Sequence, residues 1–213
     1  MMKRILKIGL PSGFQYFFEV SAFAGSSIII GWIGTNALAA HQIALNLASI
    51  TYMFALGISA AATVRVGNAV GFKSINRIRN AGFSAILMGA SVMGFFGIMF
   101  IIFRNIFPTF YIADINVIEI AASLLIIAAF FQIFDGTQSV GLGILRGISD
   151  VKVPTVITFL AYWVVGLPVG YILGFNYNLG VQGVWIGLSV ALAVSALSLS
   201  FRFNFRSKSV YFG

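Results

Sequence analysis

Two acidic residues, Glu19 and Asp135, lie deep inside long apolar stretches of the sequence. Glu19 lies 12 residues after Lys7, and Asp135 lies 11 residues before Arg146. At 1.5 Å per residue, these separations correspond to about 18 and 16 Å along a helix. Both carboxylates are therefore predicted at a similar depth, near the middle of a membrane, where a charged side chain costs on the order of 2.5–3.5 kcal/mol.

The chemistry open to such a pair is reversible binding of a proton or a cation. Intramembrane carboxylates usually face a water-filled cavity, a proton path or a cation site, and the sequence offers no basic residue at this depth to neutralise them. One site can then hold either a proton or a cation, and exchange between the two is the basis of antiport. We expect Glu19 and Asp135 to bind the coupling ion, H⁺ or Na⁺, with Na⁺ as the only metal.

Amide side chains near the two acids form a second, weaker set of candidates for lining a cavity. They are Gln15, one turn before Glu19; Gln132 and Gln138, each three residues from Asp135; and Asn46, four residues after Gln42. The alternative interpretation, hydrogen bonding between helices at about 0.6–2 kcal/mol per contact, is equally compatible with the amides alone.

The composition of the chain indicates which kind of structural element positions these residues. The chain has 213 residues, of which 60% are hydrophobic and 8% charged, against about 45–50% and about 25% in soluble domains. A soluble fold is excluded because too few charges are available to cover its surface. The absence of cysteine and the single histidine argue against disulfides, cofactors and His or Cys metal sites. No motif of an intramembrane enzyme is present.

Six stretches are long and apolar enough to cross a bilayer of about 30 Å as helices. They are residues 8–32, 43–64, 81–103, 117–145, 153–174 and 181–201. The expected fold is therefore an all-α membrane protein, a six-transmembrane-helix bundle that occupies residues 1–213 as a single lobe. Gly166, Gly170 and Gly174, and likewise Gly183 and Gly187, recur every four residues, which favours close helix packing. His41 is expected at the outer interface.

Basic residues predict the orientation of the bundle. Of the 13 lysines and arginines, all but Arg104 lie at the N-terminus, in the second and fourth connections or in the C-terminal tail. The positive-inside rule then places both termini in the cytoplasm. The net charge of +8 is this same signal, and its division among four segments argues against a nucleic-acid partner.

Several local strings resemble the seventh to twelfth helices of multidrug and toxic compound extrusion (MATE) transporters, in particular the NorM-like branch. The strings are Leu10-Pro11-Ser12-Gly13 with Phe17-Phe18-Glu19; Ala39 to Asn46; Ala62 to Asn68; Gln132 to Gln138 with Leu145-Arg146-Gly147, Asp150 and Pro154; Tyr162-Trp163 with Gly166-Leu167-Pro168 and Gly170-Tyr171; and Gly180, Gly183, Trp185 and Gly187. The likeness runs in order through nearly the whole chain. It implies the C-terminal lobe of a two-lobed transporter with a central cavity.

The resemblance implies cation-coupled export of bulky, often cationic drugs across the bacterial cytoplasmic membrane. The partners would be the bilayer, the drug, and an N-terminal lobe or a second six-helix copy. Residues matching Glu19 and Asp135 are implicated in coupling in that family, whereas the tyrosine often found one turn before the aspartate is Phe131 here. Two alternatives are a six-span substrate-binding module of a larger transport complex and a lipid-linked-sugar flippase of the same superfamily.

Overall fold

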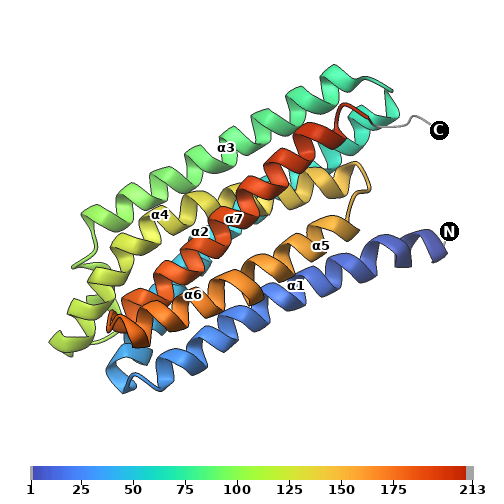
Figure 1. Ribbon diagram of the computed structural model, residues 1–213. Coiled ribbons are helices and arrows are strands. Elements are labelled where there is room, and N and C mark those ends of the chain that lie inside the picture. The colour runs from blue at the N-terminus through green and yellow to red at the C-terminus, as the bar shows by residue number, and fades with distance from the viewer. Residues whose placement is uncertain (1, 210–213) are drawn as a thin grey trace.

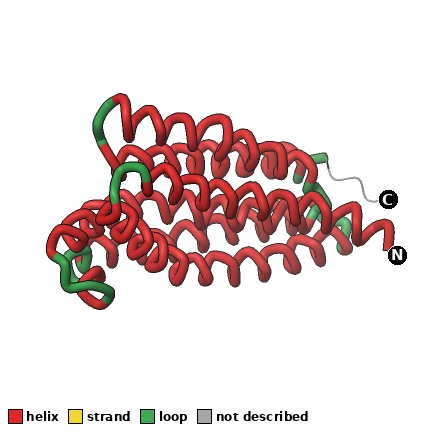
Figure 2. Tube along the Cα trace, turned by 90° about the horizontal axis from the view of Figure 1, so that it is seen from below, coloured by secondary structure: helices red, strands yellow, loops and turns green. Residues whose placement is uncertain are grey.

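Six helical rods lie side by side along the length of the molecule (Figures 1 and 2). The computed structural model describes the backbone of residues 2–209 and the side chains of residues 6–209, so the side chains of Lys3 and Arg4 fall outside the described residues. The first four rods are α1 (Met2–Gly31), α2 (Thr35–Gly71), α3 (Ile75–Ile102) and α4 (Ile115–Gly147). No strand occurs in residues 2–209, and the predicted all-α bundle is confirmed.

The fifth rod changes its helical pitch along its length. It consists of α5 (Lys152–Phe159), a π-helical segment over Leu160–Gly166, α6 (Leu167–Tyr171) and a second π-helical segment over Ile172–Asn176. Pro168 lies between the two π segments and cannot donate a backbone hydrogen bond. The sixth rod is α7 (Gly180–Arg206), and a short 3-10 turn at Phe107–Phe110 lies in the connection between α3 and α4.

Five of the six rods are long and apolar enough to cross a membrane. These are α2, α3, α4, the combined rod over Lys152–Asn176, and α7. The first helix, α1, is long enough but is not among the five, and it carries Gln15, Glu19 and four serines. Whether α1 crosses the membrane therefore stays a prediction. The same polar residues make α1 the helix most suited to a functional site.

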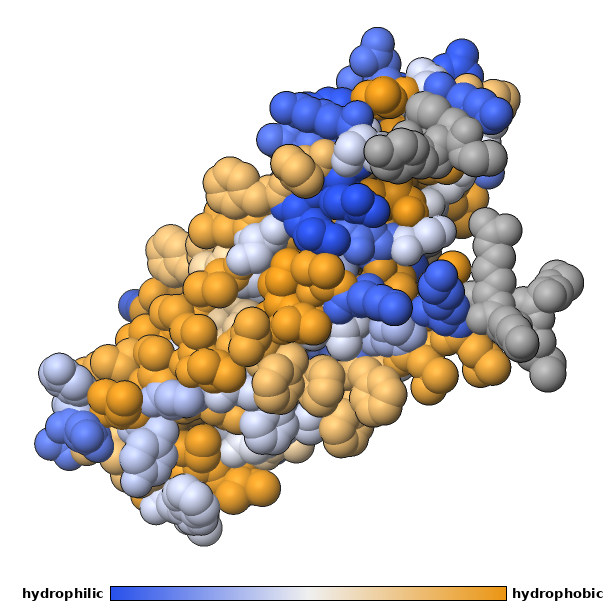
Figure 3. Space-filling model, turned by 45° about the vertical axis from the view of Figure 1, so that its right-hand side comes forward, coloured by the Kyte–Doolittle hydropathy of each residue, from blue (hydrophilic) through white to orange (hydrophobic). Residues whose placement is uncertain are grey.

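Both termini lie at one end of the bundle, together with the α2–α3 and α4–α5 turns (Figure 1). Lys73 and Ser149 adopt positive φ values of 54° and 62° in those two turns. Hydrophilic residues gather at this end on the face shown in Figure 3, and apolar residues cover most of the rest of that face. The arrangement matches the predicted clustering of basic residues, and the cytoplasmic location of this end stays a prediction.

The core lies around α4 and α7, in each of which 50% of the most apolar window is buried, compared with 22% in α3. The predicted packing role of the glycines is confirmed where α7 meets the fifth rod. A Cβ atom on Gly183 would lie 2.5 Å from the backbone nitrogen of Gly174, and one on Gly170 would lie 3.2 Å from the carbonyl oxygen of Val184. Only residues without side chains allow the two backbones to approach this closely.

Candidate functional site

The two carboxylates singled out in the sequence both lie inside the bundle. Glu19 on α1 and Asp135 on α4 are each only 6% exposed. Salt bridges among the described residues involve only Asp150, which pairs with Arg202 at 2.8 Å and Arg206 at 3.5 Å. Neither buried acid is thus neutralised by a direct basic partner in this part of the chain.

Contacts between α1 and the fifth rod hold the backbone around Glu19. The indole nitrogen of Trp163 donates to the carbonyl oxygen of Phe18 at 3.1 Å, directly beside Glu19. The Thr155 hydroxyl donates to the carbonyl oxygen of Pro11 at 2.9 Å. The rings of Phe18 and Phe159 pack with centroids 4.9 Å apart. These contacts fix the position of Glu19 along the axis of the bundle.

Gln138 connects the two sides of the site. Its Nε2 donates to Glu19 Oε1 at 3.4 Å, and the hydroxyl of Tyr162 lies 3.1 Å from Nε2 and 3.3 Å from Oε1. Gln138 and Tyr162 are 1% and 0% exposed. Because Gln138 follows Asp135 by three residues on α4, this bond links the acid of α1 to the helix that carries the second acid.

The other amides divide into buried and exposed members. Gln132 is fully buried, and its Oε1 accepts a hydrogen bond from the Thr51 hydroxyl of α2. Its Nε2 has no hydrogen-bond partner among the described residues and can donate to a ligand. Gln15 is 5% exposed, one turn from Glu19 on α1. Three of the four predicted amides therefore lie on the interior faces that bear the acids.

Asn46 is the predicted residue that the structure does not bring to this group. It is exposed on α2, and its Oδ1 accepts a hydrogen bond of 2.8 Å from the hydroxyl of Tyr111. The two residues line a separate groove of about 420 Å³ together with Gln42 and Ser49. Asn46 lies toward the end of α2 that is opposite the α2–α3 turn.

Two tyrosines complete the site, although we predicted no role for either. The hydroxyl of Tyr162 on the π segment lies 3.1 Å from Gln138 Nε2, and Tyr52 directly follows Thr51, which bonds Gln132. Ser49, Thr51 and Tyr52 form a short polar run on α2, which was a usable signal. Tyr162 belongs to one of the sequence segments that carry the family resemblance, but nothing in the sequence indicated that it would contact Gln138.

Phe131 forms the apolar wall one turn before Asp135. It is 2% exposed, and its ring packs against Trp185 and Phe23 with centroid distances of 5.4 and 6.1 Å. The hydroxyl that a tyrosine would supply here is replaced by an aromatic cluster. Oxygen ligands for a cation would therefore come from the acids, the amides and the two neighbouring tyrosines.

His41, expected at the outer interface, is enclosed by helices and 0% exposed. The indole nitrogen of Trp185 donates to His41 Nδ1 at 3.1 Å, which leaves the proton of the neutral ring on Nε2. Nε2 lies 2.9 Å from the Ser27 hydroxyl, which can donate to the carbonyl oxygen of Phe23 at 3.2 Å. The predicted depth of His41 stays a prediction, while both ring nitrogens bond within the bundle, joining α1, α2 and α7.

The site can bind a proton or a small cation within an apolar bundle. It combines two buried carboxylates with amide and phenol groups, and the described residues contain no cluster of three His, Cys, Asp or Glu side chains. Carboxylates deep in a helical bundle mark ion and substrate pathways in membrane proteins. Fold and site together define a helical membrane protein with acidic side chains buried inside its bundle.

Comparison with known proteins identifies the family. The sequence profile of the MatE family matches residues 11–172, and the chain belongs to this family. It is 41% identical over 197 residues to a probable multidrug resistance protein NorM of Mesorhizobium japonicum, covering 90% of this chain and 42% of that protein. It is 40% identical over 200 residues to the multidrug resistance protein MdtK of Proteus mirabilis, covering 92% and 44%. The chain thus spans less than half the length of these relatives.

Solved structures of MATE transporters share the fold. One in the straight conformation superposes with a TM-score of 0.91 at 20% identity, covering 98% of this chain and 47% of that one. The Vibrio cholerae transporter VcmN in the bent form gives a TM-score of 0.87 at 16% identity, covering 96% and 46%. The six rods therefore match one half of a MATE transporter fold.

Proposed function

We propose that this chain forms the C-terminal lobe of a cation-coupled exporter of bulky, often cationic drugs, with Glu19 and Asp135 binding the coupling ion. The observation that carries the proposal is the shared buried position of these two acids. Neither acid forms a salt bridge with another described residue. The printed names of the relatives, multidrug resistance proteins, support the substrate class.

Exchange at the two carboxylates would supply the coupling. Either H⁺ or Na⁺ can neutralise a carboxylate, and an organic cation competes for the same negative charge. Gln138 and Tyr162 would hold Glu19 in place as its occupant changes, because their hydrogen bonds connect it to α4 and the fifth rod. The inner membrane of a bacterium, with both termini in the cytoplasm, is the location that the basic residues support.

A second lobe completes the proposal. Alternating access in transporters built from two repeats arises when one helical bundle rocks against the other around a shared site. The relatives are more than twice as long as the matched region, which supports a partner of similar size, either an N-terminal lobe or a second copy. We expect that partner to face the side of the bundle on which α1 carries Glu19.

The test combines transport with direct binding. Ethidium efflux is measured in membrane vesicles from cells that produce the protein in its natural genetic context, with imposed Na⁺ or pH gradients. Binding of radioactive Na⁺ and of tetraphenylphosphonium is measured on the purified chain. Glu19→Gln and Asp135→Asn are expected to abolish ion-driven efflux and to weaken cation binding, while membrane expression stays normal.

Glu119→Gln is the matched control, because Glu119 is an exposed acid on α4, away from the buried group. It makes the same change of carboxylate to amide and should leave efflux and binding intact. Ethidium efflux that persists in both site variants would refute the assignment. The gradient that drives efflux distinguishes Na⁺ from H⁺ coupling.

A further inference from the structure

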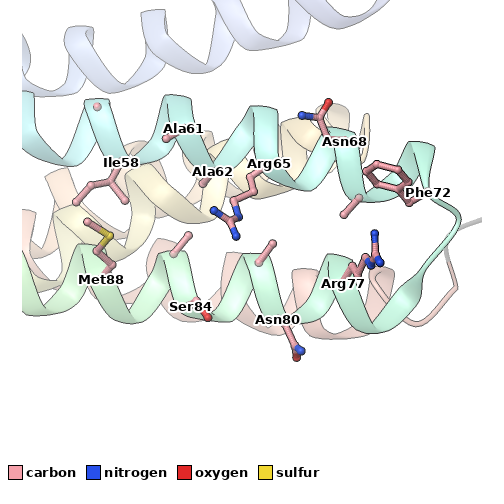
Figure 4. A pocket seen from close by; sticks show the side chains of 14 residues that line it. Ile58, Ala61, Ala62, Arg65, Asn68, Phe72, Arg77, Asn80, Ser84 and Met88 are labelled. Carbon is pink, nitrogen blue, oxygen red and sulfur yellow. The ribbon is translucent and has the colours of Figure 1, made fainter.

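A groove between α2 and α3 lies outside the carboxylate site. It opens near the end of the bundle that carries both termini, and it has a volume of about 980 Å³ (Figure 4). The buried carboxylates instead belong to α1 and α4, and Gln138 connects them to the fifth rod. The groove is therefore separate from the residues proposed to bind the coupling ion.

The part of the groove near the α2–α3 turn is basic. Arg65 extends from α2 toward α3, and Arg77 on α3 lies beside Phe72 (Figure 4), with its guanidinium 5.1 Å from the ring centroid. No lining residue is acidic, and neither arginine forms a salt bridge with another described residue. Two guanidinium groups without counter-charges favour a phosphate, which arginine binds with paired hydrogen bonds.

The opposite part of the groove is apolar. Ile58 and Met88 point toward each other from α2 and α3 (Figure 4), and small residues such as Ala61 and Ala85 leave room between the helices. This part runs along two helices that are each apolar enough to span a membrane. A groove with a basic end and an apolar continuation has the polarity of a phospholipid molecule.

We propose that this groove binds an anionic phospholipid, with the headgroup phosphate between Arg65 and Arg77 and an acyl chain along Ile58 and Met88. Basic pockets between membrane helices on the cytoplasmic side recognise acidic lipid headgroups, and the termini-bearing end is the one whose basic residues predict a cytoplasmic location. A soluble anion would use only the arginines. The proposal is independent of the coupling mechanism.

The experiment is a lipid titration of the purified chain in detergent, followed by native mass spectrometry. The probes are dioleoyl phosphatidylglycerol and dioleoyl phosphatidylcholine, which share their acyl chains, and sodium phosphate is the soluble anion. Both lipids carry the phosphate, but the quaternary ammonium of choline cancels its charge. Phosphatidylglycerol is therefore expected to bind about 30-fold more tightly than phosphatidylcholine, because each basic side chain near a net anionic headgroup contributes roughly a factor of five.

Two double variants separate the groove from general surface charge. Arg65→Gln with Arg77→Gln should remove the preference for phosphatidylglycerol. Lys152→Gln with Lys208→Gln removes the same number of charges from an exposed residue on α5 and an exposed residue just after α7, and it should change affinity by less than about twofold. Circular dichroism confirms that each variant retains its helices.

A third variant tests the apolar part. Ala61→Phe places a ring beside Ile58 while both arginines remain, so it should weaken phosphatidylglycerol binding severalfold and leave phosphate binding unchanged.

Three results would overturn the proposal. One is equal binding of the two lipids, and another is an equal loss in the two double variants. The third is sodium phosphate displacing the lipid at equal concentration, which would show a site for free anions.

If the groove instead seats a second protein lobe, a photoreactive residue at Ser84 would crosslink to protein in native membranes; lipid adducts there support the proposal.

Discussion

Gly183→Ala tests whether the close contact between α7 and the fifth rod holds the site together. A Cβ at residue 183 would lie 2.5 Å from the backbone nitrogen of Gly174 and from the carbonyl carbon of Leu173. Ordinary contact begins at 3.4 Å, so the two backbones must separate by about 0.9 Å. Both obstructing atoms belong to the backbone, and neither can move aside by changing a rotamer.

The expected cost is about 1–3 kcal/mol, the range for overpacking a well-packed interior. Alanine is a better helix former than glycine by up to about 1 kcal/mol, so this gain offsets only part of the clash. The matched control is Gly57→Ala on α2, where an added Cβ meets nothing within 4 Å. That variant should be neutral or slightly stabilising.

The measurement is unfolding of the purified protein in mixed micelles, titrated with a denaturing detergent and followed by far-ultraviolet circular dichroism. We expect the midpoint to fall for Gly183→Ala alone. Cation binding should weaken in parallel, because Tyr162 lies on the displaced rod and bonds Gln138. Equal midpoints for the two alanine variants would refute the argument that backbone contact at this crossing stabilises the lobe.

Three further substitutions test other contacts. His41→Leu leaves the buried indole nitrogen of Trp185 without its acceptor and should cost about 1–3 kcal/mol in the same unfolding titration; an unchanged midpoint would contradict the proposed role of this bond. Tyr162→Phe removes one partner of the amide beside Glu19 and should weaken cation binding about threefold with little loss of stability, which equilibrium binding would check against the wild type. Asp150→Asn weakens the pairing with Arg202 at 2.8 Å and should lower the unfolding free energy by about 1–3 kcal/mol, and a loss that did not shrink at high salt would argue against a charge effect.

Much of this architecture could be predicted because it depends on hydropathy and charge summed over many residues. Long apolar stretches predicted the helices. Counting residues from the basic ends predicted a common depth for Glu19 and Asp135, and in the structure Gln138, three residues after Asp135, reaches Glu19. Counting along a helix works when the two helices enter from the same side. This prediction needed no knowledge of which helices are neighbours.

The rotation of each helix could not be predicted in the same way. α2 is apolar on nearly all sides, so its sequence does not indicate which face turns inward. Thr51 bonds Gln132 in the buried group, whereas Asn46, about a turn and a half earlier, faces a separate groove. His41 is turned into the bundle by Trp185, a partner 144 residues away. Contacts over such separations depend on the assembled fold.

The π segments show how local geometry and site are connected. A π-helical segment rotates the residues that follow it relative to a regular helix, because each turn contains an additional residue. Tyr162 lies within the first such segment, and its hydroxyl reaches Gln138 across the bundle. The backbone carbonyl of Phe18 meets Trp163 from the same segment. One short stretch thus contacts both α4 and α1 at the level of Glu19. In the proposed function, a change in ion occupancy at this carboxylate would therefore act on the segment where the fifth rod departs from regular helical geometry.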